Sequence, residues 1–151
     1  MASDTRKDPF RGFNFRVEID GIGVAGFSEV SGLTADGDPA DYREGTDAIN
    51  NVRKLVALRK FPVMVFKRGY VKDDTLWKWY VRIANGQPDR RNGSVVLQNE
   101  AHKDVMRWNF ENAWINKIEG PALKAAGNEV SIESMELCHE GLTLELEPAT
   151  A

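Results

Sequence analysis

The chain has 151 residues, of which 42% are hydrophobic and 28% are charged, and its formal net charge is −3. These values are typical of a globular protein, and we expect one domain over residues 1–151. The weak negative charge excludes a general attraction to nucleic acid or to anionic membranes. A single cysteine excludes an internal disulfide. No apolar run approaches the roughly 20 residues of a spanning helix, so we expect neither a membrane anchor nor a signal peptide.

The stretch FRVEIDGIGVAGFSEVSG, residues 15–32, places Gly21, Gly23 and Gly26 at the spacing of a dinucleotide-binding motif. That motif binds a cofactor only where the glycine turn opens a helix, because the phosphates lie at the helix N-terminus. The residues after Gly26 show no helical period and are poor helix formers. The alternating residues before Gly21 predict a half-buried strand, with Asp20-Gly21 as a two-residue hairpin turn. We therefore expect a β-hairpin here and no cofactor.

Residues from about 34 to 54 form a polar stretch with five acidic residues, two glycines and a proline. We expect a long polar loop, and loops of this length in compact domains are commonly functional. The segment LVALRKFPVMVFKRG follows, and it is apolar and rich in β-branched residues. Its apolar residues fall on both faces of an extended chain, which predicts a strand covered on both sides.

One helix is predicted over about residues 74–84. The capping cluster Asp73-Asp74-Thr75 precedes it, and Asn85-Gly86 ends it. Its apolar residues form a broad stripe, so we expect it to pack on one side of a sheet.

The C-terminal half reads as strands. SVVLQNE and DVMRWNFEN are joined by a short turn, and the second alternates apolar with polar residues. The tail alternates in two phases, and the slip at Ser134 suggests a bulge. Leu142, Leu144 and Leu146 then alternate with polar residues near the end of the chain. We expect about seven antiparallel strands with one packed helix, and sheet edges that copies of the same chain complete.

No catalytic or metal-binding pattern is visible in the sequence. His102 and His139 are the only histidines. Neighbours on a strand point to opposite faces, so Cys138 and His139 cannot form a nucleophile–base pair, and we expect a buried thiol beside an exposed imidazole. The acidic residues at 36–47 do not follow the order of a calcium loop. We therefore expect no enzyme, no catalytic residue, no cofactor and no metal site.

An ordered set of segments resembles a known family. FNFRVEIDG leads through VAGFSEVSGL to YREG, then to VFKRG, to LWKWY and to GNEVSIESMELCHEGL. Together they resemble the tail tube proteins of contractile phage tails and of related contractile injection systems, from about residue 10 to residue 143. The resemblance implies an antiparallel β-sandwich or split barrel with one flanking helix. It also implies hexameric rings with a continuous inner β-barrel, stacked into a rigid tube.

The resemblance further implies partners and site residues. The partners are other copies of the chain, a contractile sheath protein, baseplate, initiator and terminator proteins, and a cargo of DNA or protein in the lumen. The protein would be made in the bacterial cytoplasm and would become part of a virion tail or an injection particle. The implied ring-stacking residues are Tyr42, Arg43, Glu44, Gly45, Asn50 and Asn51. The candidate lumen residues are Arg107, Asn109 and Glu111 on one strand and Asn14, Arg16 and Glu18 on another.

Other readings remain open at this point. An adaptor between tube and baseplate shares the fold but usually carries extra segments. A ring protein of a secretion system is a further possibility. A small β-barrel that binds a ligand would need a lined pocket with convergent polar groups.

Overall fold

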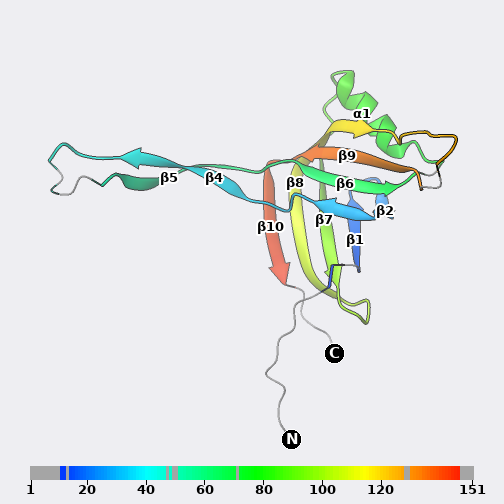
Figure 1. The fold of residues 1–151 in the computed structure, drawn as a ribbon, viewed down its shortest axis with the longest axis horizontal. Helices are drawn as coiled ribbons and strands as arrows, with labels where there is room; N and C mark the ends of the chain where they lie inside the picture. The colour runs from blue at the N-terminus through cyan, green and yellow to red at the C-terminus, as the bar shows by residue number, and fades with distance from the viewer. Residues whose placement is uncertain are drawn as a thin grey trace, which may run out of the picture.

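The computed structural model describes residues 11–12, 14–46, 48, 51–70, 72–127 and 130–146. Antiparallel strands and one helix make up the fold, as the sequence predicts (Figure 1). The elements are β1 (Phe15–Ile19), β2 (Gly23–Ala25), β3 (Glu29–Ser31), β4 (Asp36–Tyr42), β5 (Arg53–Lys60), β6 (Met64–Gly69), α1 (Thr75–Ala84), β7 (Arg91–Gln98), β8 (Asp104–Glu119), β9 (Ile132–Cys138) and β10 (Gly141–Leu146).

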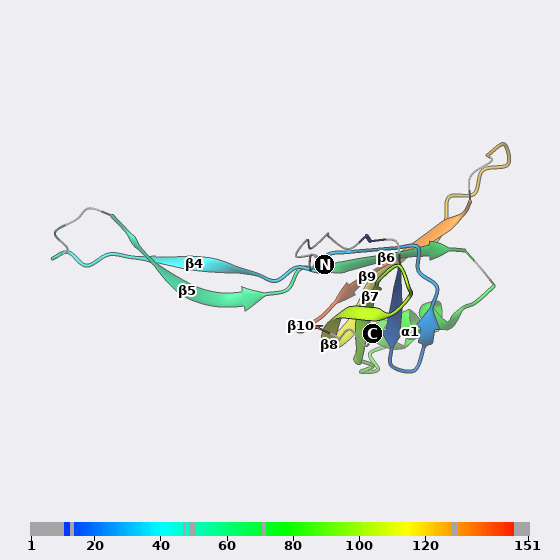
Figure 2. The same cartoon turned by 90° about the horizontal axis from the view of Figure 1, so that it is seen from below.

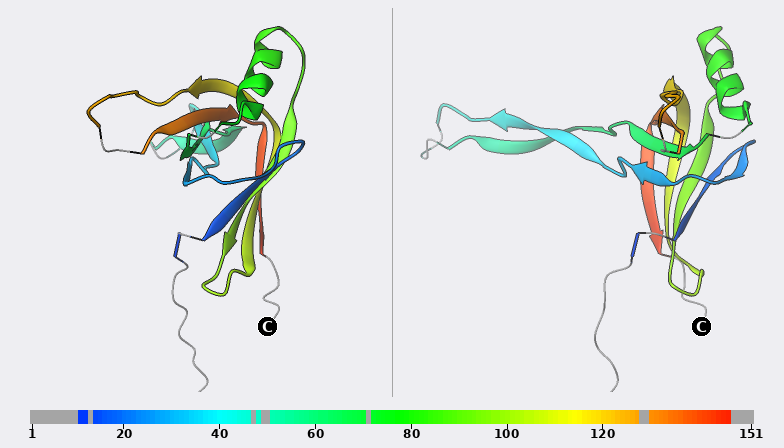
Figure 3. Two further views of the ribbon diagram at one scale, coloured as in Figure 1. Left: turned by 90° about the vertical axis from the view of Figure 1, so that its right-hand side faces the viewer. Right: turned by 45° about the vertical axis from the view of Figure 1, so that its right-hand side comes forward.

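The long strand β8 belongs to two sheets. Its first half pairs with β7 and β10, and with β1 and β2 these strands form sheet A, in the order β2-β1-β7-β8-β10. Its second half pairs with β9, and β6 and β3 complete sheet B. Between the halves lies Asn112, with a φ of 52°, a left-handed conformation that asparagine tolerates better than most residues. Sheet B therefore turns away from sheet A at this corner, as Figure 3 shows.

The core lies where the two sheets face each other. Val17 and Phe110 enter it from sheet A, and Phe66 and Leu137 enter it from sheet B; all four are buried. The rings of Phe66 and Phe110 meet edge to face with centroids 6.2 Å apart, an arrangement that aromatic pairs favour.

The helix α1 packs against β8 through two buried residues, Leu76 and Trp79. The indole Nε1 of Trp79 donates a hydrogen bond to the Asp89 carbonyl oxygen at 2.8 Å. The guanidinium of Arg91 lies 4.9 Å from the centre of the same ring. These contacts fix the helix and the segment after it on the sheet.

The strands β4 and β5 form a separate two-stranded sheet that projects from the rest of the chain (Figures 1 and 2). We call this hairpin, residues 36–60, the arm. The long polar loop predicted over residues 34–54 is thus strand at Asp36–Tyr42 and at Arg53–Lys54. A strand is recognised by apolar residues on its core face, and the arm has no core face. Ion pairs join its two strands instead, Lys54–Asp41 at 3.3 Å and Lys60–Asp38 at 3.0 Å. Such charged residues do not show the apolar alternation by which a strand is recognised in a sequence.

The expectation of a strand covered on both faces was also wrong for β5. Val56 and Leu58 are 87% and 88% exposed. The next strand, β6, alternates between buried and less buried residues instead. The apolar segment of residues 55–69 thus begins in the exposed arm and ends in the core. The spacing of its apolar residues does not reveal this change of environment.

Two local predictions differ from the structure. The β1–β2 turn has three residues between the paired Ile19 and Gly23, with Gly21 at a φ of 79°. The strand β9 has no phase slip at Ser134, and the register shift lies on the β8 side, between Ile115 and Lys117.

The predicted buried thiol of Cys138 and exposed imidazole of His139 both differ from the structure. Cys138 is half-buried, whereas the His139 side chain is buried. The two ring nitrogens of His139 lie 3.1 Å from the Gly141 oxygen and 3.2 Å from the Pro62 oxygen. The imidazole thus joins the end of β9 to the base of the arm, a contact that sequence position alone does not indicate.

Candidate assembly surfaces

One face of sheet A carries polar residues from three strands. Cross-strand register places Arg16 of β1 opposite Val96 of β7, which lies opposite Arg107 of β8. Since side chains alternate along a strand, Arg16, Arg107 and Glu18 lie on the face away from the core. We call this the polar face.

The charges on the polar face pair with one another. The guanidinium of Arg16 binds Asp104 through two hydrogen bonds, at 2.5 and 2.7 Å, and binds Glu18 at 2.8 Å. Arg107 reaches Glu18 from the other side at 3.1 Å. Hydrogen bonding from Arg16 lowers the pKa of both Glu18 and Asp104 below their usual values, and these two carboxylates raise the pKa of Arg16. The cluster therefore stays ionised, and its charges largely cancel.

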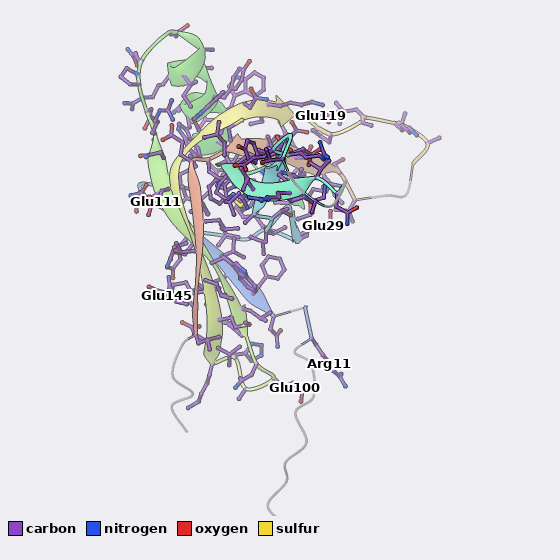
Figure 4. The ribbon with its side chains drawn as sticks, turned by 90° about the vertical axis from the view of Figure 1, so that its left-hand side faces the viewer. Arg11, Glu29, Glu100, Glu111, Glu119 and Glu145 are labelled. Atoms are coloured by element: carbon purple, nitrogen blue, oxygen red, sulfur yellow. The ribbon has the colours of Figure 1, made fainter. Side chains whose placement is uncertain are left out.

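The other candidate lumen residues extend this face. Asn109 accepts a hydrogen bond from the Ser94 hydroxyl at 2.5 Å. Asn14 donates to the Asn99 carbonyl oxygen at 3.3 Å. Glu111 is exposed on β8, and Figure 4 shows it with Glu145 on the side of sheet A away from sheet B.

The structure thus brings four of the six candidate lumen residues, Arg16, Glu18, Arg107 and Asn109, close together. Asp104 and Glu145 also belong to this face and were missed from the sequence. Glu145 alternates with the leucines of β10, and this pattern in the sequence indicates that it lies on the polar side of that strand. Its position opposite Arg107 follows only from the pairing of β10 with β8.

The candidate ring-stacking residues lie around the far end of the arm (Figure 1). Tyr42 ends β4, and its hydroxyl hydrogen-bonds to a Glu44 carboxylate oxygen at 3.0 Å. Arg43, Gly45 and Asn51 are exposed beside them, and Asn50 lies outside the described residues. The tip of the arm projects beyond both sheets, where it can contact another molecule.

The edge strand β10 is a second surface. In the described part of the chain it pairs with β8 alone. Leu144 and Leu146, which point to the core side of sheet A by register, are 53% and 73% exposed there. An open edge with exposed leucines is suited to pairing with a further strand.

The described residues give little support for a metal site, a membrane-spanning helix or a nucleotide-binding motif. Within the ranges that the structure describes, no three His, Cys, Asp or Glu residues are grouped to hold a metal ion. The one described helix, α1, is too short to cross a membrane. The glycine motif of residues 21–26 leads into β2 and β3 rather than into a helix.

Comparison with known proteins adds to this geometry. A search of curated proteins gives no match. Among solved structures, a chain of the PVC sheath–tube complex, an extracellular contractile injection system in the extended state, has a TM-score of 0.82 at 23% identity and 92% and 93% coverage of the two chains. A chain of the anti-feeding prophage tube-terminating cap has a TM-score of 0.86 at 24% identity, with 97% of both chains covered. Hcp1 from Flavobacterium johnsoniae has a TM-score of 0.59 at 14% identity, with 87% and 94% covered. These likenesses show a shared fold and confirm the predicted fold class.

The family model described as T4-like virus tail tube protein gp19 matches residues 11–143. This match covers most of the chain and confirms the family that the ordered segments suggested. The chain belongs to the tail tube protein family.

Proposed function

We propose that six copies of this chain close a ring and that the rings stack into the hollow inner tube of a contractile injection system. The observation that carries the proposal is the open edge of sheet A, where β10 exposes its leucines in a chain of the tail tube family. Closing the sheet between copies removes the edge and buries these side chains.

The size of such a ring follows from sheet geometry. Four strands of sheet A, namely β1, β7, β8 and β10, run the height of the sheet, whereas β2 has three residues. Six copies would supply about 24 strands at about 4.8 Å spacing, tilted by about 35–45°. The backbone-to-backbone diameter would then be about 45–50 Å. A barrel that also included β2 would be wider by about a quarter.

In this ring the polar face lines the lumen. Arg16, Arg107, Glu18 and Asp104 are paired within each copy, and Glu111 and Glu145 add exposed acidic groups, so the wall offers no free cation among these residues to hold an anionic molecule. The arm tip, with Tyr42, Arg43, Glu44, Gly45, Asn50 and Asn51, contacts the adjacent ring. These assignments rest on the position of the arm and on the polarity of the face.

The proposed partners are a contractile sheath around the tube, and baseplate and terminator proteins at its ends. Similar chains come from a sheath–tube complex, a baseplate and a terminating cap. The cargo in the lumen would be DNA or effector proteins. Synthesis would take place in the bacterial cytoplasm, and the role would be structural rather than enzymatic.

A tube-to-baseplate adaptor is the second candidate. It is favoured by the similarity of this fold to a chain of the anti-feeding prophage baseplate, with a TM-score of 0.81 at 21% identity. An adaptor would form single rings that do not extend into tubes.

Negative-stain electron microscopy of the purified protein, with light scattering on the same sample, tests these roles. We expect sixfold rings and hollow tubes with the diameter given above. Single rings that never stack would favour the adaptor. A monomer that persists at high concentration and also fails to add to preformed baseplates would overturn both.

A further inference from the structure

The described residues cover only part of the core-side face of sheet A. The lower half of sheet A extends beyond sheet B, as Figure 3 shows. A groove of about 310 Å³ lies there, and its apolar lining includes Phe15, Leu97 and Trp108 from sheet A and Val30 and Leu33 from the segment around β3. These five side chains are all only half-buried. The face therefore carries an apolar hollow that the described residues leave open.

The lining of the groove favours an apolar occupant. Among the described residues that line it, Glu29 alone is charged, and its carboxylate pairs with Lys67 at 3.3 Å. A charged ligand would thus find no unpaired counter-charge in this lining. Leu144 of β10 lies opposite Trp108 and is half exposed, so the apolar surface continues from the groove towards the edge of sheet A. An open apolar face of this kind promotes aggregation of a free subunit.

The N-terminal segment joins the fold beside this groove. Gly12 is itself part of the lining. Arg11 pairs with Glu100 at 3.6 Å, and Figure 4 shows both at the end of sheet A away from α1. The Gln98 backbone N–H donates to the Asn14 carbonyl oxygen at 2.8 Å, which holds the chain along β7. The Cα atom two positions before Gly12 can lie no more than about 7 Å from the Gly12 Cα atom.

We propose that residues 1–10 cover this groove in their own copy, with the Phe10 ring in the apolar hollow against Leu97 and Trp108. This segment, MASDTRKDPF, lies outside the described residues and leads directly into Arg11. Phe10 is the large apolar residue of the segment that is nearest to Gly12 in sequence. Residues 147–151, EPATA, contain no large apolar side chain that could take its place. The contact shields the apolar face of the free subunit.

The short connection to Gly12 favours this segment over the same segment of a second copy. A group held by a short flexible tether has an effective concentration of the order of mM at a neighbouring site. That value is far above the concentration of other copies in a dilute solution of subunits. The inference concerns a contact within one copy, so it does not rest on the proposed function.

A disulfide within one chain tests the contact. A Cys138→Ser background carries Phe10→Cys and Leu33→Cys, and the dilute protein is oxidised before its free thiols are counted with a maleimide. The matched control pairs Phe10→Cys with Leu123→Cys, an exposed leucine on the connection between β8 and β9. We expect the first pair to lose both thiols while the chain remains a monomer on a denaturing gel. The control pair should keep most of its thiols.

A mixture of the two single variants, Phe10→Cys and Leu33→Cys, shows which copy supplies the segment. We expect no covalent dimer after oxidation of this mixture. A dimer would place the segment of another copy in the groove and would overturn the inference, as would equal thiol loss in the test and control pairs. Rings or tubes seen by electron microscopy bear on the proposed function alone, because the disulfide forms or fails within a single copy.

A dye that fluoresces on exposed apolar surface, 8-anilinonaphthalene-1-sulfonate, provides a test without cysteines. Phe10→Ala empties the hollow, so we expect dye fluorescence to rise at least about twofold. Phe10→Leu keeps an apolar side chain and should stay near wild type, and Thr5→Ala changes a polar position of the same segment as the matched control. Wild-type fluorescence in a folded Phe10→Ala variant would overturn the inference. Should that variant fail to fold, the disulfide result decides.

Discussion

At the scale of single residues, sheet B contains a buried ion pair that the sequence pattern did not indicate. Arg68 of β6 and Glu133 of β9 are both buried, and Arg68 Nε donates to a Glu133 carboxylate oxygen. Arg68 also donates to Asp73 at 3.3 Å, and Asp73 accepts hydrogen bonds from the backbone N–H and hydroxyl of Thr75. The pair thus connects the sheet to the start of α1.

We expect Glu133→Gln to lower the free energy of unfolding by about 3 kcal/mol, because it leaves the buried Arg68 guanidinium without its main counter-charge. Urea unfolding of the monomer, followed by tryptophan fluorescence, measures the loss. The double variant Arg68→Met with Glu133→Leu is the control, and it should stay near wild-type stability because both charges are replaced by apolar side chains. A loss below about 1 kcal/mol for Glu133→Gln would contradict the assigned role.

The polar face predicts a dependence of stability on pH. In the folded protein, hydrogen bonding from Arg16 holds the pKa of Asp104 below its ordinary value of 3.8. A lowered pKa means that the stabilisation is present above about pH 4 and is lost as the pH falls through the folded pKa. We expect Asp104→Asn to lower the free energy of unfolding by about 1 kcal/mol at pH 7.

The difference between Asp104→Asn and wild type should shrink below pH 4, where the wild-type carboxyl also becomes neutral. Asp20→Asn, at an exposed position in the β1–β2 turn, is the matched control and should change little at either pH. A gap between Asp104→Asn and wild type that is constant from pH 7 to pH 2 would show that the loss is not electrostatic.

At the scale of elements, α1 contains two tryptophans of opposite character. Trp79 is buried, with a hydrogen bond from its indole and Arg91 over its ring, whereas Trp77 is 53% exposed. Two residues apart on a helix, these positions point about 200° apart, so one faces the sheet and the other faces outward.

We expect Trp79→Ala to lower the free energy of unfolding by about 3–5 kcal/mol, since it leaves a cavity between α1 and β8. Trp77→Ala, on the same helix, should change it by no more than about 1 kcal/mol. Thermal unfolding of the two monomeric variants measures both. Equal losses would mean that the helix contributes through propensity rather than through the packing of Trp79.

At the scale of the whole molecule, a residue on the open edge of sheet A can be changed to affect assembly between copies with little effect on the folding of one copy. Leu144 contributes little to the core of its own copy because it is half exposed. A lysine at an edge strand hinders pairing with another strand. We expect Leu144→Lys to leave the free energy of unfolding of the monomer within about 0.5 kcal/mol of wild type and to abolish ring closure.

Size-exclusion chromatography with light scattering measures this effect. Leu123→Lys introduces the same charge at an exposed leucine away from the edge, and it should form rings normally. Rings in the Leu144→Lys variant would show that β10 is not part of the contact between copies.

The sequence by itself determined the antiparallel β class, the single helix and its ends, and the absence of a helix after the glycine motif, because each follows from local periodicity and turn chemistry. About seven strands were expected, whereas the described residues form ten. The ordered segments also indicated the tail tube family. Alternation likewise placed Arg16 and Glu18 on one face of β1 and Arg107 on one face of β8. These features depend on a few neighbouring residues, so they can be recognised within a short stretch.

Only the tertiary structure decided which of these faces meet. The pairing of β1, β7 and β8 brings Arg16, Glu18 and Arg107 together, and the bend of β8 at Asn112 separates the two sheets. The strand β4 escaped prediction because it faces no core, whereas most of β5 lay in the predicted apolar strand. The buried environments of Glu133 and His139 escaped prediction because Arg68 and Pro62, which they contact, are far away in sequence. Contacts between distant segments depend on the register of strand pairing, and the alternation of one strand fixes its two faces but not its partners.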